Sequence, residues 1–353
     1  MNILIIELGK SHIECTYTFV YLLSLQKKDI HLICNSELYP DFPMKNKLKG
    51  YALMPNSFTL LSTISTIIRI RQYIKKNKIE YIIFNTTEIK IIRNIFIFLP
   101  NQINFFGLVH NARKIETGSS VKKIFSKRMK KYFLIGNHLV KKTNTYQGLS
   151  AYPYFPIYFP LPAKKHIHKE IDDIWVTIVG GVNLDRRDYI QLLELIKGNK
   201  FRKSIKFIFL GKLYYSDQIN AEICNQNWWK ESIISFSDHV DYDLFHNYLA
   251  NTDIILPLIK FESENTFFDQ RISGSFNVGL GYKIPFLLPD SYQNIDIKPF
   301  SISYASYDQL CDILNEISAN NKILDQVRSQ YDTSLLFNFE EESIKITRYI
   351  EGN

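Results

Sequence analysis

The stretch IWVTIVGGVNLDRRDYIQLLELIKG, residues 174–198, contains an apolar run, a pair of glycines and then a helical pattern. The first part, IWVTIV, is short and uncharged, which is typical of a strand buried on both faces. In the last part, DYIQLLELIKG, apolar residues recur at helical spacing until Gly198. A strand, a glycine turn and a helix in this order predict one unit of a parallel sheet that is covered by helices.

The rest of the second half repeats this rhythm. Short apolar runs predict buried strands, and runs with helical spacing predict helices. The further strands are IKFIFLG at 205–211 and DIILPLI at 253–259, and the further helices are DLFHNYLANT at 243–252, SFNVGLGY at 275–282, YDQLCDILNEIS at 307–318 and FEEESIKITRYIE at 339–351. Alternation of this kind is typical of a doubly wound α/β domain.

The first half alternates in the same way. The predicted strands are NILIIE at 2–7, DIHLICN at 29–35, YIIFNTT at 81–87 and INFFGLVH at 103–110, and the predicted helices are TYTFVYLLSL at 16–25 and LLSTISTIIRIRQYIKKN at 60–77. A chain of 353 residues is long enough for two domains. We therefore expect two successive α/β domains that bind ligands at the carboxyl ends of their strands.

A proline-rich segment, YPYFPIYFPLPAKK at 152–165, separates the halves. Proline prevents helix continuation and removes a donor from a strand ladder, so this segment is expected to be an extended connector. The resulting prediction is a first domain at 1–155, a linker at 156–170 and a second domain at 171–335. The helix at 336–353 is predicted to pack back on the first domain.

Composition excludes several classes of protein. The hydrophobic content of 46% argues against disorder, and the four cysteines are scattered without the spacing of a disulfide framework or a zinc site. Charged residues follow the first apolar run too soon for a signal peptide, and no uncharged apolar run is long enough to span a bilayer. A cytoplasmic, reducing location fits these features.

The formal net charge of +8 is concentrated in VKKIFSKRMKKYFLIGNHLVKKT, residues 121–143, where aromatic residues are embedded among lysines. Such a stretch suits an anionic lipid surface, which predicts peripheral binding to the inner membrane. The alternative is an ordinary solvated lysine-rich face. Nucleic acid is not expected as a partner because its binding motifs are absent from the sequence.

Two turns in the second half combine small residues with arginine ahead of a helix. Backbone N–H groups at a helix N-terminus bind phosphate, and guanidinium groups pair with its oxygens. The first turn holds Gly180, Gly181, Arg186 and Arg187, and the second, RISGSFNVGLGYKIPF at 271–286, holds Arg271, Ser273, Gly274 and Ser275. Two such turns predict a diphosphate site, although either serine can also act as an ordinary helix cap.

The order of motifs in the second half resembles the donor-binding domain of GT-B glycosyltransferases. The motifs are IVGGVNLDRRDY, FIFLGK and FSDHVDYDLFHNYLANTDIILPLI, followed by the glycine/serine turn and GYKIPF. The resemblance implies two Rossmann-like domains facing a cleft, with the acceptor bound by the domain at 1–155 and the nucleotide sugar by the domain at 171–335. It also implies that Gly181, Arg186 and Lys212 face the diphosphate and that HVDY at 239–242, with Val240 and Tyr242, borders the base.

The same resemblance places Asn277 near the ribose. The sequence lacks the Glu-x7-Glu pattern of many retaining members, since Gln270 and Val278 lie near the expected positions. The Asp-x-Asp of DYD at 241–243 is interpreted as a helix cap, because GT-B members usually neutralise the leaving diphosphate with cationic side chains and helix dipoles. Hence no metal or other cofactor is predicted.

The first domain offers two candidate catalytic histidines. His110 follows a predicted strand and is interpreted as a general base or, in a retaining enzyme, as a polar contact to the sugar. His12 lies in the loop after the first strand, where inverting relatives commonly carry a base, and Glu14 can orient its ring, bind an acceptor hydroxyl or cap the next helix. Gly9, Lys10 and Asn111 are the candidate acceptor-side residues.

The predicted function is transfer of a sugar from a nucleotide-diphosphate sugar to a glycan or a lipid-linked glycan during synthesis of a bacterial surface polysaccharide, such as a capsule or O-antigen. Two alternatives stay open. One is a sugar-nucleotide epimerase, which needs carboxylates beside the sugar. The other is a catalytically silent homologue that serves as a binding subunit.

Overall fold

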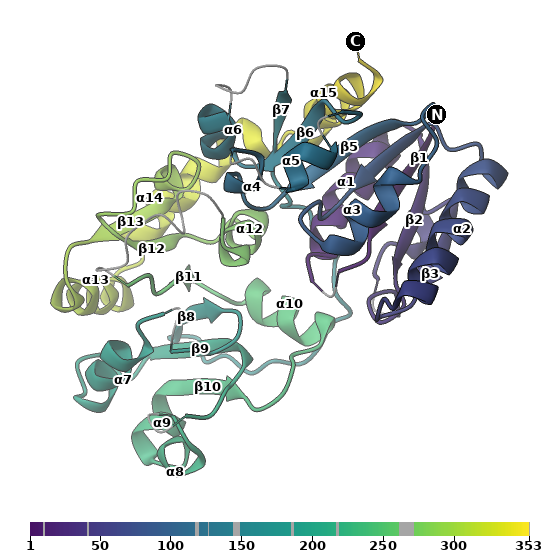
Figure 1. Cartoon of the computed structure of the whole chain (residues 1–353). Coiled ribbons are helices and arrows are strands. Elements are labelled where there is room, and N and C mark those ends of the chain that lie inside the picture. The colour runs from purple at the N-terminus through teal and green to yellow at the C-terminus, as the bar shows by residue number, and fades with distance from the viewer. Residues whose placement is uncertain are drawn as a thin grey trace. The chain divides into compact units, whose positions relative to one another are not determined.

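The computed structural model describes residues 1–9, 11–40, 42–116, 120–125, 127–143, 149–184, 187–216, 219–260 and 272–352. The chain forms two compact units (Figure 1). The first consists mainly of Met1–Pro160 and Leu336–Asn353, and the second mainly of Leu161–Thr266 and Ser273–Leu335. Each unit is built around one parallel sheet.

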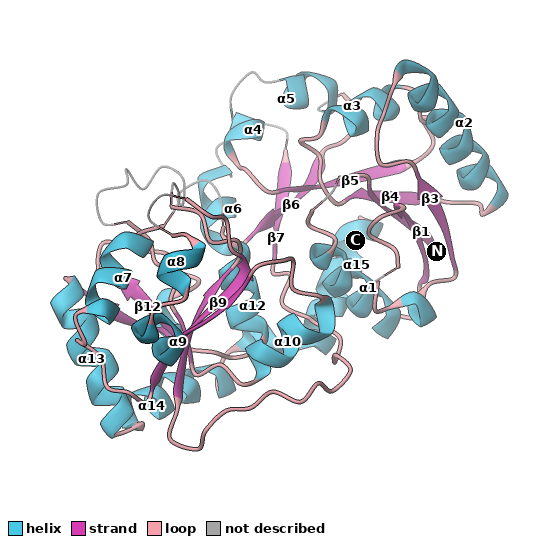
Figure 2. Cartoon of the chain, turned by 90° about the horizontal axis from the view of Figure 1, so that it is seen from below, coloured by secondary structure: helices cyan, strands magenta, loops and turns pink. Residues whose placement is uncertain are grey.

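The first unit contains a seven-stranded sheet in the order β3-β2-β1-β4-β5-β6-β7, and every pairing is parallel. The strands are β1 (Asn2–Glu7), β2 (Asp29–Asn35), β3 (Gly50–Met54), β4 (Tyr81–Phe84), β5 (Asn104–Val109), β6 (Lys131–Ile135) and β7 (Ser150–Tyr154). Strand β1 is buried from Ile3 onward, as expected for a central strand covered on both faces. Figure 2 shows strands of this sheet in magenta.

Helices cover both faces of this sheet. They are α1 (Glu14–Leu25), α2 (Leu60–Lys76), α3 (Lys90–Ile97), α4 (Arg113–Glu116), α5 (Ser120–Phe125), α6 (Asn137–Thr143) and the C-terminal α15 (Phe339–Glu351), with a 3-10 turn η1 (Lys45–Lys47). One core cluster joins the sheet to α2, α3 and α5 through residues such as Ile70, Phe96 and Phe125. Helices α1 and α15 pack against each other in the same unit.

Helix α15 is attached to the first unit by polar contacts as well as by packing. Lys28 forms a salt bridge of 2.7 Å with Glu351, and Gln26 donates a hydrogen bond of 2.8 Å to Ser343. On the sheet side, Lys131 donates to the carbonyl of Tyr349 at 2.7 Å. The last helix of the chain is therefore part of the unit that the first 160 residues build.

The second unit contains a six-stranded parallel sheet in the order β10-β9-β8-β11-β12-β13. Its strands are β8 (Ile174–Val179), β9 (Ile205–Lys212), β10 (Ile233–Phe236), β11 (Ile254–Ile255), β12 (Phe286–Pro289) and β13 (Ser301–Tyr304). Its helices are α7 (Tyr189–Lys197), α8 (Ala221–Cys224), α9 (Asn227–Ser232), α10 (Tyr242–Ala250), α12 (Gly274–Gly281), α13 (Tyr307–Ala319) and α14 (Lys322–Asp332), with a 3-10 turn η2 (Lys298–Phe300). A further 3-10 turn, η3 (Leu335–Phe337), begins at the last residue of the second unit and continues into the first.

The predicted alternation of strands and helices is confirmed in both halves, and both sheets are parallel as expected. The prediction of an extended connector is wrong for residues 152–154, which belong to β7. Strand β7 lies at the edge of its sheet, where Pro153 costs no ladder bond on the outer side. The predicted strand at 253–259 is also too long, since β11 spans only Ile254–Ile255.

The expectation for the basic stretch 121–143 needs a correction. Its aromatic residues Phe125, Tyr132 and Phe133 are buried in the core, so they cannot contact a membrane. The described lysines Lys123, Lys127 and Lys130 are exposed. Among the described helices, none combines the length and apolar character needed to cross a membrane.

Candidate functional site

Two histidines meet at the carboxyl edge of the first sheet. His110 directly follows β5, and His12 lies in the loop between β1 and α1. Their rings are stacked with centroids 4.3 Å apart and an angle of 28° between the planes. Strand β4 separates β1 from β5 in the sheet, so side chains from both loops can reach across its end.

The ring of His110 is fixed by a backbone carbonyl. Its Nε2 lies 2.8 Å from the carbonyl oxygen of Asn85. A carbonyl can only accept, so Nε2 carries the proton and Nδ1 keeps a lone pair in the neutral ring. Burial lowers the pKa of His110 below its ordinary value. The ring is therefore poised to act as a base at neutral pH.

His12 lies in a different electrostatic environment. Its Nδ1 is 3.5 Å from Oε1 of Glu14, and this interaction raises the pKa of His12 above its ordinary value despite partial burial. The backbone of His12 has a φ of 70°, a left-handed conformation that turns the chain into α1. The two stacked rings thus have pKa values pushed in opposite directions, a pattern typical of acid–base pairs.

Three further polar residues around the pair were missed by the sequence analysis. Asn85 Nδ2 donates a hydrogen bond of 2.8 Å to the carbonyl of His12 and one of 2.7 Å to Glu7 Oε2. Since the carbonyl of Asn85 also accepts from His110, this residue contacts both histidine loops. Glu7 also accepts from Thr86 Oγ1 at 2.6 Å and from the amide of Gly9 at 2.6 Å. The available signal was the polar run NTT, which follows β4 where the strand ends.

Glu88 is the fourth missed residue. Its Oε1 accepts hydrogen bonds from the amides of His110, at 2.7 Å, and Asn111, at 3.0 Å. These bonds fix the direction in which the chain leaves β5. Asn111, a candidate acceptor-side residue, is buried and accepts from the amide of Arg113 at the start of α4. It therefore has a structural task in the described chain.

Gly9 lies beside the same network. A Cβ atom at this position would approach Glu7 Oε1 to 2.8 Å, so glycine leaves room for the carboxylate. Lys10, the third candidate acceptor-side residue, is outside the described residues.

One group of potential metal ligands occurs among the described residues. Atoms of His12, Cys15 and His110 lie within 4.8 Å of one another. Burial raises the pKa of the Cys15 thiol well above its ordinary value, whereas a metal ligand must be a thiolate. Binding of a metal by this cluster would therefore have to displace the thiol proton.

In the second unit, the end of β8 forms a glycine turn with an arginine. Gly180 has a φ of 104°, which favours glycine, and Gly181 is exposed. Arg187 donates a hydrogen bond of 2.5 Å to the carbonyl of Val179, so its guanidinium lies at the carboxyl end of β8. Arg186 is outside the described residues.

A neighbouring strand is packed tightly under this turn. A Cβ atom at Gly211 of β9 would lie 2.4 Å from the carbonyl carbon of Gly180 and 2.8 Å from the amide nitrogen of Gly181. Lys212 follows Gly211 as the last residue of β9 and is exposed. Two candidate phosphate contacts, the glycine turn and Lys212, therefore lie at adjacent strand ends.

Helix α12 presents the second candidate turn. Ser273 caps the helix, since its Oγ accepts from the amide of Ser275 at 3.4 Å and from its hydroxyl at 2.9 Å. Gly274 is exposed, and a Cβ atom there would meet nothing within 4 Å. Asn277 is buried, and its Oδ1 has no hydrogen-bond partner among the described residues. Arg271 and Gln270 are outside the described residues.

Sheet topology relates the two turns. Strand β11, which precedes α12, pairs with β8, which precedes the glycine turn. Beyond the ends of these two strands, the amide of Asp188 donates a hydrogen bond of 3.2 Å to the carbonyl of Leu258. The segments that follow β8 and β11 therefore lie together at the carboxyl edge of the second sheet, where ligands of such sheets bind.

The HVDY segment at 239–242 precedes α10. Val240 is buried and Tyr242 is half-buried, with its ring 4.1 Å from that of His246. Asp241 caps the helix by accepting from the amide of Leu244 at 3.0 Å. The interpretation of DYD as a helix cap is thereby confirmed.

The chain is similar in fold to several solved structures. One is HepE of Anabaena in complex with UDP and glucose, with a TM-score of 0.66 and 9% identity over 100% of both chains. A glycosyltransferase from Rickettsia africae gives a TM-score of 0.62 and 15% identity over 100% of this chain and 99% of that chain. The UDP-GlcNAc 2-epimerase of Methanocaldococcus jannaschii gives a TM-score of 0.53 and 12% identity over 91% of this chain and 94% of that chain.

These likenesses establish the fold, which is the two-domain GT-B architecture of parallel α/β sheets. No protein-family model matches the sequence, and no curated protein is similar to it.

Proposed function

We propose that the protein is a glycosyltransferase that moves a sugar from a nucleotide-diphosphate sugar to a carbohydrate or lipid-linked glycan acceptor. The observation that carries this proposal is the stacked pair of His12 and His110, whose pKa values are shifted apart. Synthesis of a bacterial surface polysaccharide at the cytoplasmic face of the membrane is the proposed setting.

In this proposal the second unit holds the donor. Amides of the turn at Gly180 and Gly181 and of the N-terminus of α12 face the diphosphate, together with Arg187 and Lys212. Positive charge and aligned amides at this edge would stabilise the negative charge that develops on the leaving diphosphate. Val240 and Tyr242 border the base, and Asn277 contacts the ribose. No metal is proposed.

His110 is the proposed general base. Its Nδ1 takes the proton from the acceptor hydroxyl, whose oxygen forms the new bond to the sugar while the bond to the diphosphate breaks. His12, whose pKa is raised by Glu14, stacks on the ring of His110, and Glu14 orients it. Replacing His110 or His12 by Ala should abolish turnover. Unchanged turnover in both variants would remove these roles, and a wild-type protein without turnover would favour the silent binding subunit.

UDP is the proposed nucleotide, because the similar HepE structure contains UDP. Thermal-shift measurements with UDP, GDP, CMP and dTDP test this choice. We expect stabilisation by UDP and a reduced shift for Arg187→Ala. Arg202→Ala is the matched control, because Arg202 is an exposed arginine of the same unit. Equal shifts in both variants would contradict the donor site.

A sugar-nucleotide epimerase is the second candidate. Carboxylates beside the sugar are what this reaction needs, and Glu7, Glu14 and Glu88 all contact the histidine loops or the residues that position them. An epimerase acts on the donor without an acceptor. Incubation of UDP-sugars with the protein alone, followed by NMR, separates the two candidates: an epimerised sugar would replace the transferase proposal.

A further inference from the structure

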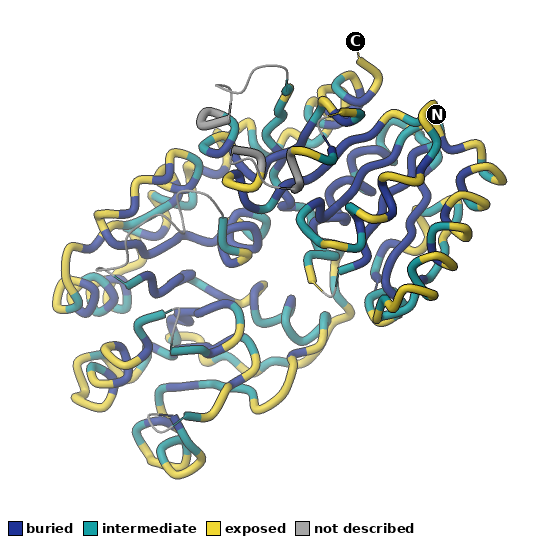
Figure 3. The backbone as a smooth tube through the Cα atoms, in the orientation of Figure 1, coloured by how far each residue is buried: buried dark blue, intermediate teal, exposed yellow. Residues whose placement is uncertain are grey.

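Helix α2 exposes a row of large apolar side chains. Leu60 and Leu61 are 78% and 79% exposed, and Ile64 and Ile68 are about half exposed. At 3.6 residues per turn these four positions fall within an arc of about 100°. The residues that α2 buries, Thr66, Ile70 and Ile74, lie on a separate arc of the helix, centred about 130° away from the exposed row. Figure 3 shows the outward side of α2 as exposed.

The C-terminal end of α3 continues this surface. Ile97 and Phe98 are 56% and 53% exposed. Arg71 of α2 donates a hydrogen bond of 3.2 Å to the carbonyl of Phe98, and this bond joins α2 to the end of α3. The surface formed by Leu60, Leu61, Ile64, Ile68, Ile97 and Phe98 is called the α2–α3 surface below.

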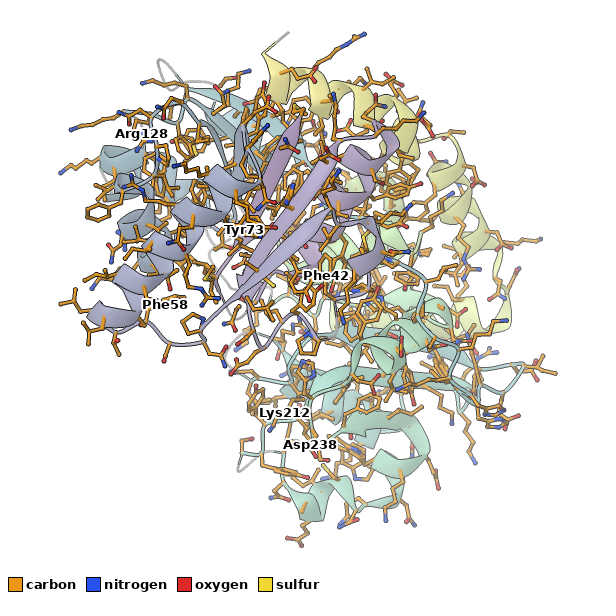
Figure 4. The ribbon with its side chains drawn as sticks, turned by 90° about the vertical axis from the view of Figure 1, so that its right-hand side faces the viewer. Phe42, Phe58, Tyr73, Arg128, Lys212 and Asp238 are labelled. Atoms are coloured by element: carbon orange, nitrogen blue, oxygen red, sulfur yellow. The ribbon has the colours of Figure 1, made fainter. Side chains whose placement is uncertain are left out.

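Arg128 connects the basic stretch to the same place. Its guanidinium donates to the carbonyls of Phe96, Leu99 and Pro100, at 3.0, 3.0 and 2.7 Å. Exposed Lys127 and Lys130 flank Arg128 in the chain. Figure 4 looks at the side of the molecule that carries α2 and labels Phe58 just before this helix, Tyr73 within it, and Arg128.

The elements of the α2–α3 surface carry only positive charge. Helix α2 has four basic residues, α3 has two and the stretch 120–130 has five, and none of the three contains Asp or Glu. Large exposed apolar side chains among Lys and Arg residues are typical of segments that lie in the interface of an anionic bilayer. A second copy of the same surface would be repelled by like charge.

We propose that the α2–α3 surface docks on an anionic lipid bilayer. Leu60, Leu61, Ile97 and Phe98 enter the boundary between headgroups and acyl chains, and the surrounding lysines and arginines contact the headgroups. The surface replaces the buried aromatic residues of 121–143 as the apolar part of a membrane contact. This inference does not depend on the proposed reaction, because lipid binding is measured without donor or acceptor.

Flotation of the full chain with vesicles tests the proposal. We expect binding to vesicles of phosphatidylcholine and phosphatidylglycerol that weakens with salt, and little binding to phosphatidylcholine alone. Leu60→Gln combined with Leu61→Gln should lower the partition coefficient about tenfold or more, since each buried CH2 contributes to binding. Lys123→Glu combined with Lys127→Glu should lower it to a similar extent and flatten the salt dependence.

Leu335→Gln is the matched control, because Leu335 is 78% exposed in the second unit. It should bind vesicles as the wild type does, and circular dichroism should give the same melting curve for all variants. An equal loss in Leu335→Gln, or equal binding to neutral vesicles, would overturn the proposal. The proposal would also be overturned if the wild type fails to bind vesicles and instead forms a dimer in sedimentation that the variant with Leu60→Gln and Leu61→Gln does not form.

A depth measurement gives an independent readout. The three tryptophans, Trp175, Trp228 and Trp229, all lie in the second unit. Leu61→Trp therefore adds the first tryptophan to the α2–α3 surface. Brominated lipids should quench its fluorescence beyond the quenching of the wild type, and no extra quenching would count against insertion.

Discussion

His12 and His110 occupy one small volume and yet have pKa values that are shifted in opposite directions. The difference comes from their partners, since Glu14 raises the pKa of His12 while burial lowers that of His110. The sequence allowed both histidines to be chosen, because each follows a predicted strand. Their stacking was not predictable, because it depends on the left-handed backbone at His12 and on Asn85, which is distant in sequence.

Glu14→Gln separates the roles of the two histidines. Removing the carboxylate lowers the pKa of His12, so a pH limb of kcat/KM that belongs to His12 should move to lower pH. A limb that belongs to His110 should barely move, because burial is the first cause of its shift. The measurement is kcat/KM from pH 5 to 9. If the limb assigned to His12 moves to higher pH instead, Glu14 does not raise the pKa of His12 as described.

Asn85→Ala tests a positioning role. Without its side chain, the loop of His12 loses a hydrogen bond, and we expect kcat to fall about 10- to 100-fold because small displacements of catalytic groups are costly. The UDP-induced thermal shift should stay unchanged, since that site is proposed in the second unit. The 15N chemical shifts of the His12 ring should change because its loop loses the bond from Asn85 Nδ2, whereas those of His110 should stay unchanged because its partner is the backbone carbonyl of residue 85.

The control for Asn85→Ala is Asn77→Ala. Asn77 ends α2 in the same unit and donates to the carbonyl of Tyr73. This variant should keep kcat and the histidine signals. If both variants lose the same activity, Asn85 has no special role.

Among the elements, the long central strands and the amphipathic helices could be predicted because their hydrophobic patterns are strong. Several short ones could not. Strands β10, β12 and β13 have four residues each, and β3 at the sheet edge is mostly half-exposed, so no pattern marked them. Strand β7 was missed because Pro153 argues against a strand unless its position at the edge is already known.

Gly211→Ala tests the packing of the β9 strand end against the glycine turn. The added methyl group would collide with backbone atoms of Gly180 and Gly181, which cannot rotate away as a side chain can. We expect a loss of about 1–3 kcal/mol in the free energy of unfolding and weaker UDP binding. Gly274→Ala has open space around its Cβ and should leave stability unchanged. Denaturant titration measures the free energy of unfolding of both variants. Equal values for Gly211→Ala and Gly274→Ala would contradict the tight packing at Gly211.

At the scale of the whole molecule, tryptophan fluorescence can follow the second unit alone, because all three tryptophans lie in it. Ile346 of α15 is buried and Ile344 is 40% exposed. Ile346→Ala should destabilise the first unit by about 2–5 kcal/mol, whereas Ile344→Ala should have little effect. Since all tryptophans lie in the second unit, circular dichroism should report an earlier transition for Ile346→Ala while tryptophan fluorescence keeps the wild-type midpoint. A fluorescence midpoint that shifts equally would indicate that the units unfold together.

The position of α15 has a consequence for synthesis on the ribosome. Residues 1–160 leave the exit tunnel first, but the helix that covers α1 is translated after the entire second unit. During this interval the side of α1 that α15 covers stays exposed, and we expect chaperones to bind it. Chains truncated at residue 335 and released from the ribosome should therefore retain chaperones longer than released chains that include α15.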